Sequence, residues 1–426
     1  MLQRIFAYYR TTPVAKKISH FTLLATLVFL GDASLSYFVP NYIENTFQNS
    51  FIMGLVISTS SLVGLAADLV LPQLMPRLST KKALLFTTIF QLVFISTLLV
   101  TLFYPQLWLF FLAMACWGLY FEFLTFSTKI FVTKKVPHPM NSIAWANIMF
   151  GRSLSYVIGP IFVTSLIFRG NLTVLLTVLI ISLLTQLVSL LFPVKTTTLE
   201  QQEENIFQTP KLLLEIKYWK KLTKTAWPAL IITFLFSLID AAFWTIGTVL
   251  AIKLENIFFY AFLFLPLYVI PMIFAQLILM KKAVGNHKER LAALFLLLGA
   301  ITLSLINKQS NNWLLLLIAF TTGFFSSLAF TLTEAANTDL EDRMGIHRQH
   351  LIGFSNSLFS LGYIVGPFLA GLLSSLYHEQ LSFSIIGMST AIVSLGVLIF
   401  APKRAILPQK EMQKWTEDKP NNTKKH

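Results

Sequence analysis

Long apolar stretches separated by short polar breaks run through the whole chain. Twelve of them are long enough to be helices that cross a hydrocarbon core, which takes about 20 apolar residues. They lie near 19–42, 51–75, 83–104, 107–132, 141–168, 171–192, 225–251, 256–280, 290–307, 311–336, 347–376 and 379–401. Turn residues mark the breaks, as in Tyr104-Pro105-Gln106 and Gly285-Asn286-His287. The pattern predicts an all-α integral membrane protein with twelve transmembrane helices.

The positions of lysine and arginine predict how these helices are oriented. With the N-terminus inside, 29 of the 33 basic residues fall in cytoplasmic segments. Three lie in outer loops (Arg169, Lys253 and Lys308), and Arg152 lies within a span. Because cytoplasmic loops carry the excess of Lys and Arg, we expect both termini in the cytoplasm and the protein in the plasma (inner) membrane. The net charge of +14 then faces the anionic inner leaflet, and no nucleic-acid partner is needed.

Composition excludes several classes of protein. The chain is 55% hydrophobic and 12% charged, whereas a soluble domain carries roughly 25% charged residues. Cys116 is the only cysteine, so an intrachain disulfide is impossible. No GxxxxGK[ST] loop, HExxH or GxSxG motif is present. We therefore expect no ATP hydrolysis, no enzyme activity, no cofactor and no metal site.

A polar stretch divides the twelve spans into two sets of six. The predicted organisation is a cytoplasmic N-terminus (1–18), a six-helix bundle (19–192), a cytoplasmic linker (193–224), a second six-helix bundle (225–402) and a basic tail (403–426). The linker turns amphipathic over 210–222, which predicts either a segment on the membrane surface or a solvated connector.

The two sets are similar in sequence. Ser153-Leu-Ser-Tyr-Val-Ile-Gly-Pro160 matches Ser360-Leu-Gly-Tyr-Ile-Val-Gly-Pro367, an offset of 207 residues, and Asp32-Ala33 matches Asp240-Ala241, an offset of 208. Parallel repeats of six helices place a solute site between the halves, near mid-membrane.

With these features the chain resembles the Major Facilitator Superfamily over residues 19–402, and loosely its drug:proton antiporter branch. The resemblance implies two pseudo-symmetric six-helix bundles that transport a solute. The antiporter signature G-x8-G-x3-G-P-x2-G-G is matched in the eleventh span by Gly353, Gly362, Gly366, Pro367 and Gly371, with Ala370 as the one mismatch, and only partly in the fifth by Gly159 and Pro160. Since small residues four apart let helices approach closely, we interpret these positions as a helix-packing or hinge element.

Four charged residues are predicted to lie well inside the membrane, where a charge costs roughly 2.5–3.5 kcal/mol. Asp32 is the leading candidate for proton coupling, followed by Asp240 and Glu122. A desolvated carboxylic acid binds a proton more readily than one in water; the alternative is a structural hydrogen bond to a neighbouring helix. Equal depth on consecutive helices predicts that Glu122 forms an ion pair with Arg152. That pair is either structural or frees Arg152 for an anionic solute, and Arg152 could instead pair with Asp32.

Further candidates lie near the predicted cavity and its inner mouth. Tyr37, Tyr120 and Trp244 are aromatic candidates for solute contact. The gate candidates at the cytoplasmic ends of the helices are Lys129, Glu334, Arg77 and Asp68. Interfacial snorkelling is the alternative for Lys129 and Glu334.

These features together predict a monomeric secondary active transporter that works by alternating access. We expect proton-coupled export of a small, partly apolar molecule. Uptake of a nutrient or of an anionic metabolite at Arg152 is the alternative within this class. A non-transporting membrane scaffold or sensor is the alternative outside it, and a polytopic membrane enzyme would need site motifs that the sequence lacks.

Overall fold

The computed structural model describes residues 13–75, 79–136, 141–191, 212–255, 257–281, 287–308, 311–344 and 348–402. Arg77, most of the expected linker and the tail beyond 402 lie outside these residues. Within them the chain is helical throughout. In the first half the helices are α2 (Pro13–Phe47), α3 (Ser50–Leu74), α4 (Thr80–Thr101), α5 (Leu107–Lys135), α6 (Asn141–Ile167) and α7 (Asn171–Leu191).

The second half begins with a long helix that changes its winding. The chain runs from α8 (Leu212–Ala242) through a π-helical turn, η3 (Phe243–Gly247), into α9 (Thr248–Glu255). Then follow η4 (Phe259–Leu263), α10 (Phe264–Lys281), α11 (Lys288–Ser304), η5 (Ile306–Lys308), α12 (Asn312–Met344), α13 (Arg348–Leu376) and α14 (Glu379–Phe400).

The helices confirm the predicted all-α fold with two sets of six spans. Ten described segments are long and apolar enough to cross a membrane, with α8, η3 and α9 acting as one. Two shorter apolar helices, Asn171–Thr185 and Phe259–Ala275, occupy the places of the remaining predicted spans.

The helix α8 begins at Leu212, earlier than the expected start near 225. The reason is the apolar face of its first turns, where Tyr218 and Leu222 are buried against Leu340 and Met344 of α12 and Leu351 of α13. Burial against two helices within the bundle stabilises this amphipathic stretch better than a connector exposed to water.

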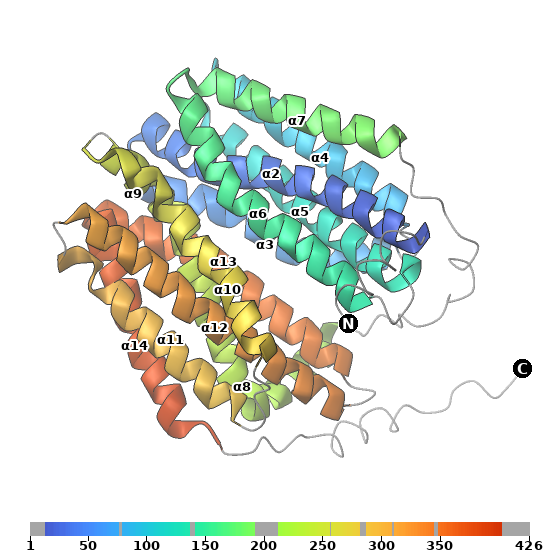
Figure 1. Cartoon of the computed structure of the whole chain (residues 1–426), viewed down its shortest axis with the longest axis vertical. Helices are drawn as coiled ribbons and strands as arrows, with labels where there is room; N and C mark the ends of the chain where they lie inside the picture. Colours follow the sequence, from blue (N-terminus) through green and yellow to red (C-terminus); the bar gives the residue numbers. More distant parts are fainter. Residues whose placement is uncertain are drawn as a thin grey trace, which may run out of the picture.

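Two bundles lie side by side, α2–α7 in blue to green and α8–α14 in yellow-green to red (Figure 1). In the first, α2 packs against α6 and α5 packs against α3 and α4; in the second, α8 packs against α13 and α11 against α12 and α14. The bundles meet chiefly where α3 contacts α13 and α6 contacts α10.

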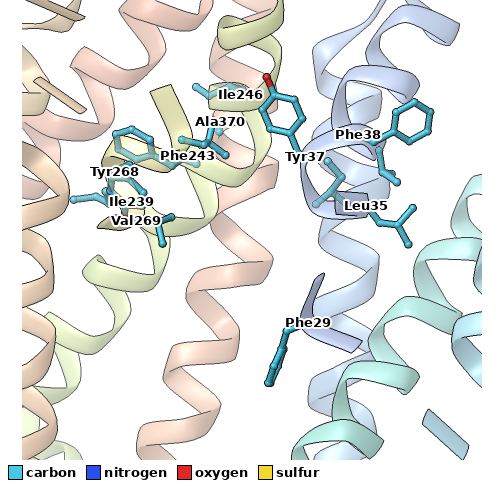
Figure 2. Packing of buried hydrophobic residues seen from close by; sticks show 14 of the residues in the cluster. Phe29, Leu35, Tyr37, Phe38, Ile239, Phe243, Ile246, Tyr268, Val269 and Ala370 are labelled. Carbon is cyan, nitrogen blue, oxygen red and sulfur yellow. The ribbon is translucent and has the colours of Figure 1, made fainter. Parts of the chain in front are cut away.

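The helices end at two opposite faces of the protein. The basic face is where α2 and α8 begin and α5 and α12 end; the opposite face is where α2, α9 and α13 end. Near the opposite face a buried core connects the bundles. Figure 2 shows Tyr37 of α2 pointing toward the segment that carries Ile246. Phe243 and Tyr268 lie on the side of that segment away from Tyr37.

Candidate functional site

A cavity of about 630 Å³ lies between the two bundles. Helices α2, α3, α5 and α6 line it from one bundle, and α8, α10, α12 and α13 from the other. Lys129 and Glu334 line its end near the basic face, where both are exposed, whereas Asp32 and Asp240 line its depth and are buried. The cavity therefore opens toward the basic face.

Asp32 is held by three donors on both of its oxygens. It is 1% exposed. Trp117 Nε1 donates to Oδ1 at 2.8 Å, the Tyr120 hydroxyl donates to the same oxygen, and the Tyr156 hydroxyl donates to Oδ2. These donors come from α5 and α6, so Asp32 joins α2 to both helices. Tyr120, predicted as a solute contact, is fully buried and supports Asp32.

Asp240 occupies the matching place on α8 with fewer partners. It is 5% exposed, and the Tyr363 hydroxyl from α13 donates to its Oδ2. Among the described residues no donor reaches the other oxygen, Oδ1, at full hydrogen-bond geometry, but the Tyr268 hydroxyl lies near enough to be a second, weaker donor to this carboxyl group. Tyr268, on α10, lies close enough to Asp240 to interact with it electrostatically.

Arg152 lines the same cavity as the two aspartates. Its guanidinium interacts electrostatically with Asp32 and Asp240 and lies over the rings of Phe29 at 5.7 Å and Tyr156 at 5.5 Å. Contact with aromatic faces adds cation–π attraction where water is excluded. The cavity thus has a partly buried cation that interacts with a carboxylate of each bundle.

The structure does not form the predicted ion pair between Glu122 and Arg152 in the part of the chain it describes. Glu122 instead interacts with Asp68 and Lys129. The physical reason is packing: α6 packs chiefly against α2, and α5 packs against α3 and α4. Equal depth on consecutive helices therefore did not bring the two side chains together.

The other predicted residues are placed as follows. Trp244 lines the cavity, with its ring edge-on to that of Tyr156 at 5.1 Å. Tyr37 lies outside the cavity lining and is fully buried between the bundles near the opposite face, which corrects its assignment as a solute contact. Asp68, Lys129 and Glu334 line the cavity toward its mouth.

Most glycines of the predicted motif lie at close helix approaches. Side chains would collide with α2, α8 or α3 at Gly159, Gly362, Gly366 and Gly371. Gly353 has no such neighbour, because nothing lies within 4 Å of the place its Cβ would take. Pro160 and Pro367 lie inside α6 and α13, and Pro367 also lines the cavity.

Polar contacts that the sequence did not reveal join the bundles at the opposite face. Lys253 Nζ of α9 lies 3.6 Å from Glu44 Oε1 of α2 and 2.5 Å from Glu379 Oε1 of α14. Ser50 Oγ and Ser374 Oγ are 3.3 Å apart. The only signal for this cluster was that Lys253 is one of three basic residues in the predicted outer loops. The cavity is thus open at one face and sealed at the other.

This arrangement of helices matches a known family of transporters. A family model described as Major Facilitator Superfamily matches residues 21–306 and 266–423. The chain belongs to the Major Facilitator Superfamily. It is therefore a multi-pass membrane transporter and not an enzyme, as its sequence predicted.

Solved structures share the same fold. The nucleoside transporter NupG aligns with a TM-score of 0.70 at 14% identity, covering 92% of this chain and all of its own. A POT family transporter in complex with a thioalcohol-conjugated peptide gives 0.70 at 14%, covering 91% and 96%. A D-xylose–proton symporter gives 0.66 at 13%, covering 91% and 98%. Among curated proteins no sequence matches the chain.

Proposed function

We propose that the protein is a proton-coupled secondary transporter that works by alternating access. The observation that carries this proposal is a cavity between two bundles that is open at one face, sealed at the other, and charged at its depth. The basic face is then the cytoplasmic one, since Lys and Arg concentrate there. In this assignment the structure is the inward-open conformation, and Lys253 belongs to the outer seal.

The charge of the cavity favours a cationic solute. Its lining contains five acidic side chains (Asp32, Asp68, Glu122, Asp240, Glu334) and two basic ones (Lys129, Arg152). Where these carboxyl groups are ionised, their excess over basic groups concentrates cations in the cavity. Arg152 already faces two carboxylates, so the structure gives less support to an anionic solute held by this arginine.

The aromatic lining favours a solute that is partly apolar. Trp117, Phe121, Tyr156, Trp244 and Tyr363 line the cavity near its charged depth. Aromatic faces bind organic cations through their quadrupoles, with about 0.5–2 kcal/mol for each contact. We therefore propose that the solute is a small organic cation with an apolar body, and that protons drive its export.

Uptake is the second candidate for the direction of transport. Among the matched structures one is entitled a D-xylose–proton symporter and one a nucleoside transporter. They share only the fold at 13–14% identity, yet they fit uptake at least as well as export. Measuring both fluxes decides between the two directions: antiport moves the proton and the solute in opposite directions across the membrane, and symport moves them in the same direction.

The charge class is tested with ions of one shape and opposite sign. Binding of radiolabelled tetraphenylphosphonium and of tetraphenylborate to detergent-purified protein is compared, with triphenylphosphine oxide as a neutral competitor. We expect the cation to bind and the anion not to bind. The opposite preference would support the anionic alternative at Arg152.

The coupling is tested in proteoliposomes with a pH-sensitive dye inside and an imposed gradient. Organic cations, nucleosides and sugars are added in turn, with protein-free liposomes as the control. Proton movement triggered by a cation is the expected result. Solute transport without proton movement would refute the coupling, and no transport by correctly inserted protein would favour a scaffold or sensor.

A further inference from the structure

The sealed end of the cavity contains a serine whose hydroxyl has no partner within the protein. Ser36 of α2 lines the cavity and is 6% exposed. Among the described residues none forms a hydrogen bond with its hydroxyl. Ser36 follows Asp32 by four residues, so it lies on the same side of the helix and about 6 Å nearer the opposite face. The hydroxyl is therefore available to a molecule that reaches the end of the cavity.

A proline frees a second polar atom at the same place. Pro40 lies inside α2 and also lines the cavity. In an α-helix the N–H of residue 40 would donate to the carbonyl oxygen of Ser36, but proline has no N–H. The carbonyl oxygen of Ser36 is thus left without its helical donor. Because Ser36 and Pro40 both line the cavity, this oxygen lies on the cavity side of α2.

Other hydroxyls in this region are bonded within their own helices. Ser34 of α2 donates to the carbonyl oxygen of Leu30 at 2.7 Å. Thr245 lines the same cavity from the second bundle and donates to the carbonyl oxygen of Ala241 at 2.7 Å. Bonds of this kind are a common state of serine and threonine inside helices. Ser36 differs from these neighbours because both its hydroxyl and its carbonyl oxygen are free.

The internal repeat shows that this polar end belongs to one bundle. The offset of 208 residues between the halves relates Ser36 to Trp244 and Pro40 to Thr248. Trp244 lines the cavity with an aromatic ring, and Thr248 has the backbone N–H that proline lacks. The matching place in the second bundle therefore has neither the serine hydroxyl nor the proline that frees a carbonyl oxygen. A solute at this end meets polar atoms on one side and an indole ring on the other.

The two free atoms determine which chemical group they can bind. A carbonyl oxygen only accepts hydrogen bonds, whereas a serine hydroxyl both donates and accepts. A solute O–H or N–H can donate to the carbonyl oxygen, and a solute hydroxyl can at the same time accept from Ser36. An alkyl group in the same place would displace water from both atoms and leave them unsatisfied, which weakens binding. The arrangement therefore favours a hydrogen-bond donor over an apolar group.

We propose that the hydroxyl and the carbonyl oxygen of Ser36 form a subsite for a hydrogen-bond donor of the solute, an O–H or N–H group, beyond the charged depth of the cavity. Pro40 keeps the carbonyl oxygen free for it. The solute is then an organic cation whose donor group lies about one helical turn, ~6 Å, from the part held at the depth of Asp32. The inference rests on the proposed function and narrows the solute from an apolar cation to one with such a group.

The test compares three triphenylphosphonium cations that share their charge and aromatic body. Their side chains are 4-hydroxybutyl, 4-methoxybutyl and pentyl, which are similar in length and differ in hydrogen bonding. Each displaces radiolabelled tetraphenylphosphonium from detergent-purified protein. The measured quantity is the ratio of the dissociation constants of two of these cations on the same protein. This ratio cancels a general change in affinity for cations and isolates the contribution of the end group.

Two variants remove the two atoms separately. Ser36→Ala deletes the hydroxyl, and Pro40→Ala supplies the N–H that occupies the carbonyl oxygen. Each should lower the preference for the hydroxybutyl over the pentyl cation about fivefold, the effect of one hydrogen bond. The methoxy group accepts but cannot donate, so its preference over pentyl should fall in Ser36→Ala and not in Pro40→Ala. Ser34→Ala, the same substitution at a hydroxyl already bonded within α2, is the control and should keep the wild-type ratios.

The outcomes separate this inference from the proposed function. Equal ratios in the wild type, Ser36→Ala and Pro40→Ala would overturn the subsite, and so would an equal loss of preference in the control. If Pro40→Ala does not fold, the ratios of Ser36→Ala and the control decide alone. Binding of all three cations with ratios that no variant changes would leave the proposed cationic solute standing. If folded wild-type protein binds none of the three, the cationic solute and the subsite both fail.

Discussion

Removing the ammonium group of Lys253 should loosen the seal at the opposite face. Lys253→Met keeps the apolar stem of the side chain but leaves Glu44 and Glu379 facing each other without a cation. Of the two contacts, only the one with Glu44, at 3.6 Å, joins the bundles, since Glu379 belongs to the same bundle as Lys253. The variant therefore weakens the closed state of this face relative to the open one.

The size of the effect follows from burial. The side chain of Lys253 is 51% exposed, and those of Glu44 and Glu379 are 11% and 12% exposed. Exposed ion pairs contribute about 0.2–1 kcal/mol, and breaking a fully buried pair costs about 3–5 kcal/mol. A half-exposed lysine between two mostly buried carboxylates lies between these limits, at about 1.5 kcal/mol. That energy corresponds to about a tenfold larger population open at this face.

The assay is the rate at which a maleimide labels Ser374→Cys in a background with Cys116→Ala. Ser374 is 8% exposed and lies at the seal, so labelling requires opening of this face. Lys253→Met should raise the rate about tenfold. Lys288→Met is the matched control, because it breaks a contact with Asp339 at 2.6 Å within one bundle, near the basic face. An unchanged rate for Lys253→Met, or an equal rise in the control, would refute the reasoning.

Three further predictions follow from the packing between helices. The hydroxyls of Ser50 and Ser374 are 3.3 Å apart, so the double variant Ser50→Cys/Ser374→Cys should form a disulfide that stops transport until it is reduced. Each single variant should still transport. Transport by the oxidised double variant would contradict the closed seal. Gly118→Ala should lower the free energy of unfolding in detergent by about 1–3 kcal/mol, because its Cβ would collide with the backbone of α3. Gly353→Ala is the control: open space surrounds that position, so the free energy of unfolding should change by less than about 0.5 kcal/mol. Arg152→Met should lower the free energy of unfolding by about 1–3 kcal/mol, because it removes a partly exposed cation that interacts with two buried carboxyl groups; an unchanged unfolding midpoint would show that these groups are neutral.

The fold could be predicted from the sequence because every helix that crosses a membrane must be long and apolar, and both properties can be read from the chain. Every predicted span has a helix in the structure, with the helix α7 ending the first set at Leu191 and the helix α8 beginning the second at Leu212. The start of α8 was misplaced because its first turns are amphipathic. Lys220 and Lys221 make that stretch look like a connector, while Tyr218 and Leu222 make it a buried helix. Whether this stretch is buried depends on its contacts with α12 and α13, and the local sequence pattern does not contain that information.

The depth of the site residues could also be predicted, but their partners could not. Counting residues along a helix gives the height of a side chain in the membrane and leaves its direction around the helix axis unknown. Glu122 and Arg152 share a height and face different neighbours. The seal around Lys253 was missed because its two carboxylates come from helices that are far apart in sequence.

The internal repeat predicted the pair Asp32 and Asp240, and the same repeat explains why the pair is unequal. Tyr156 and Tyr363 match across the halves, and each donates to its own aspartate. The offset that relates Lys129 to Glu334 relates the other two donors of Asp32, Trp117 and Tyr120, to Thr322 and Phe325. Phe325 has no hydroxyl, and Thr322 is hydrogen-bonded to Thr302. The second bundle therefore keeps the acid and one donor but lacks the other two. A repeat with equal donors would hold both carboxylates alike, whereas this one fixes Asp32 with three donors and leaves Asp240 with the Tyr363 hydroxyl and a weaker contact to Tyr268.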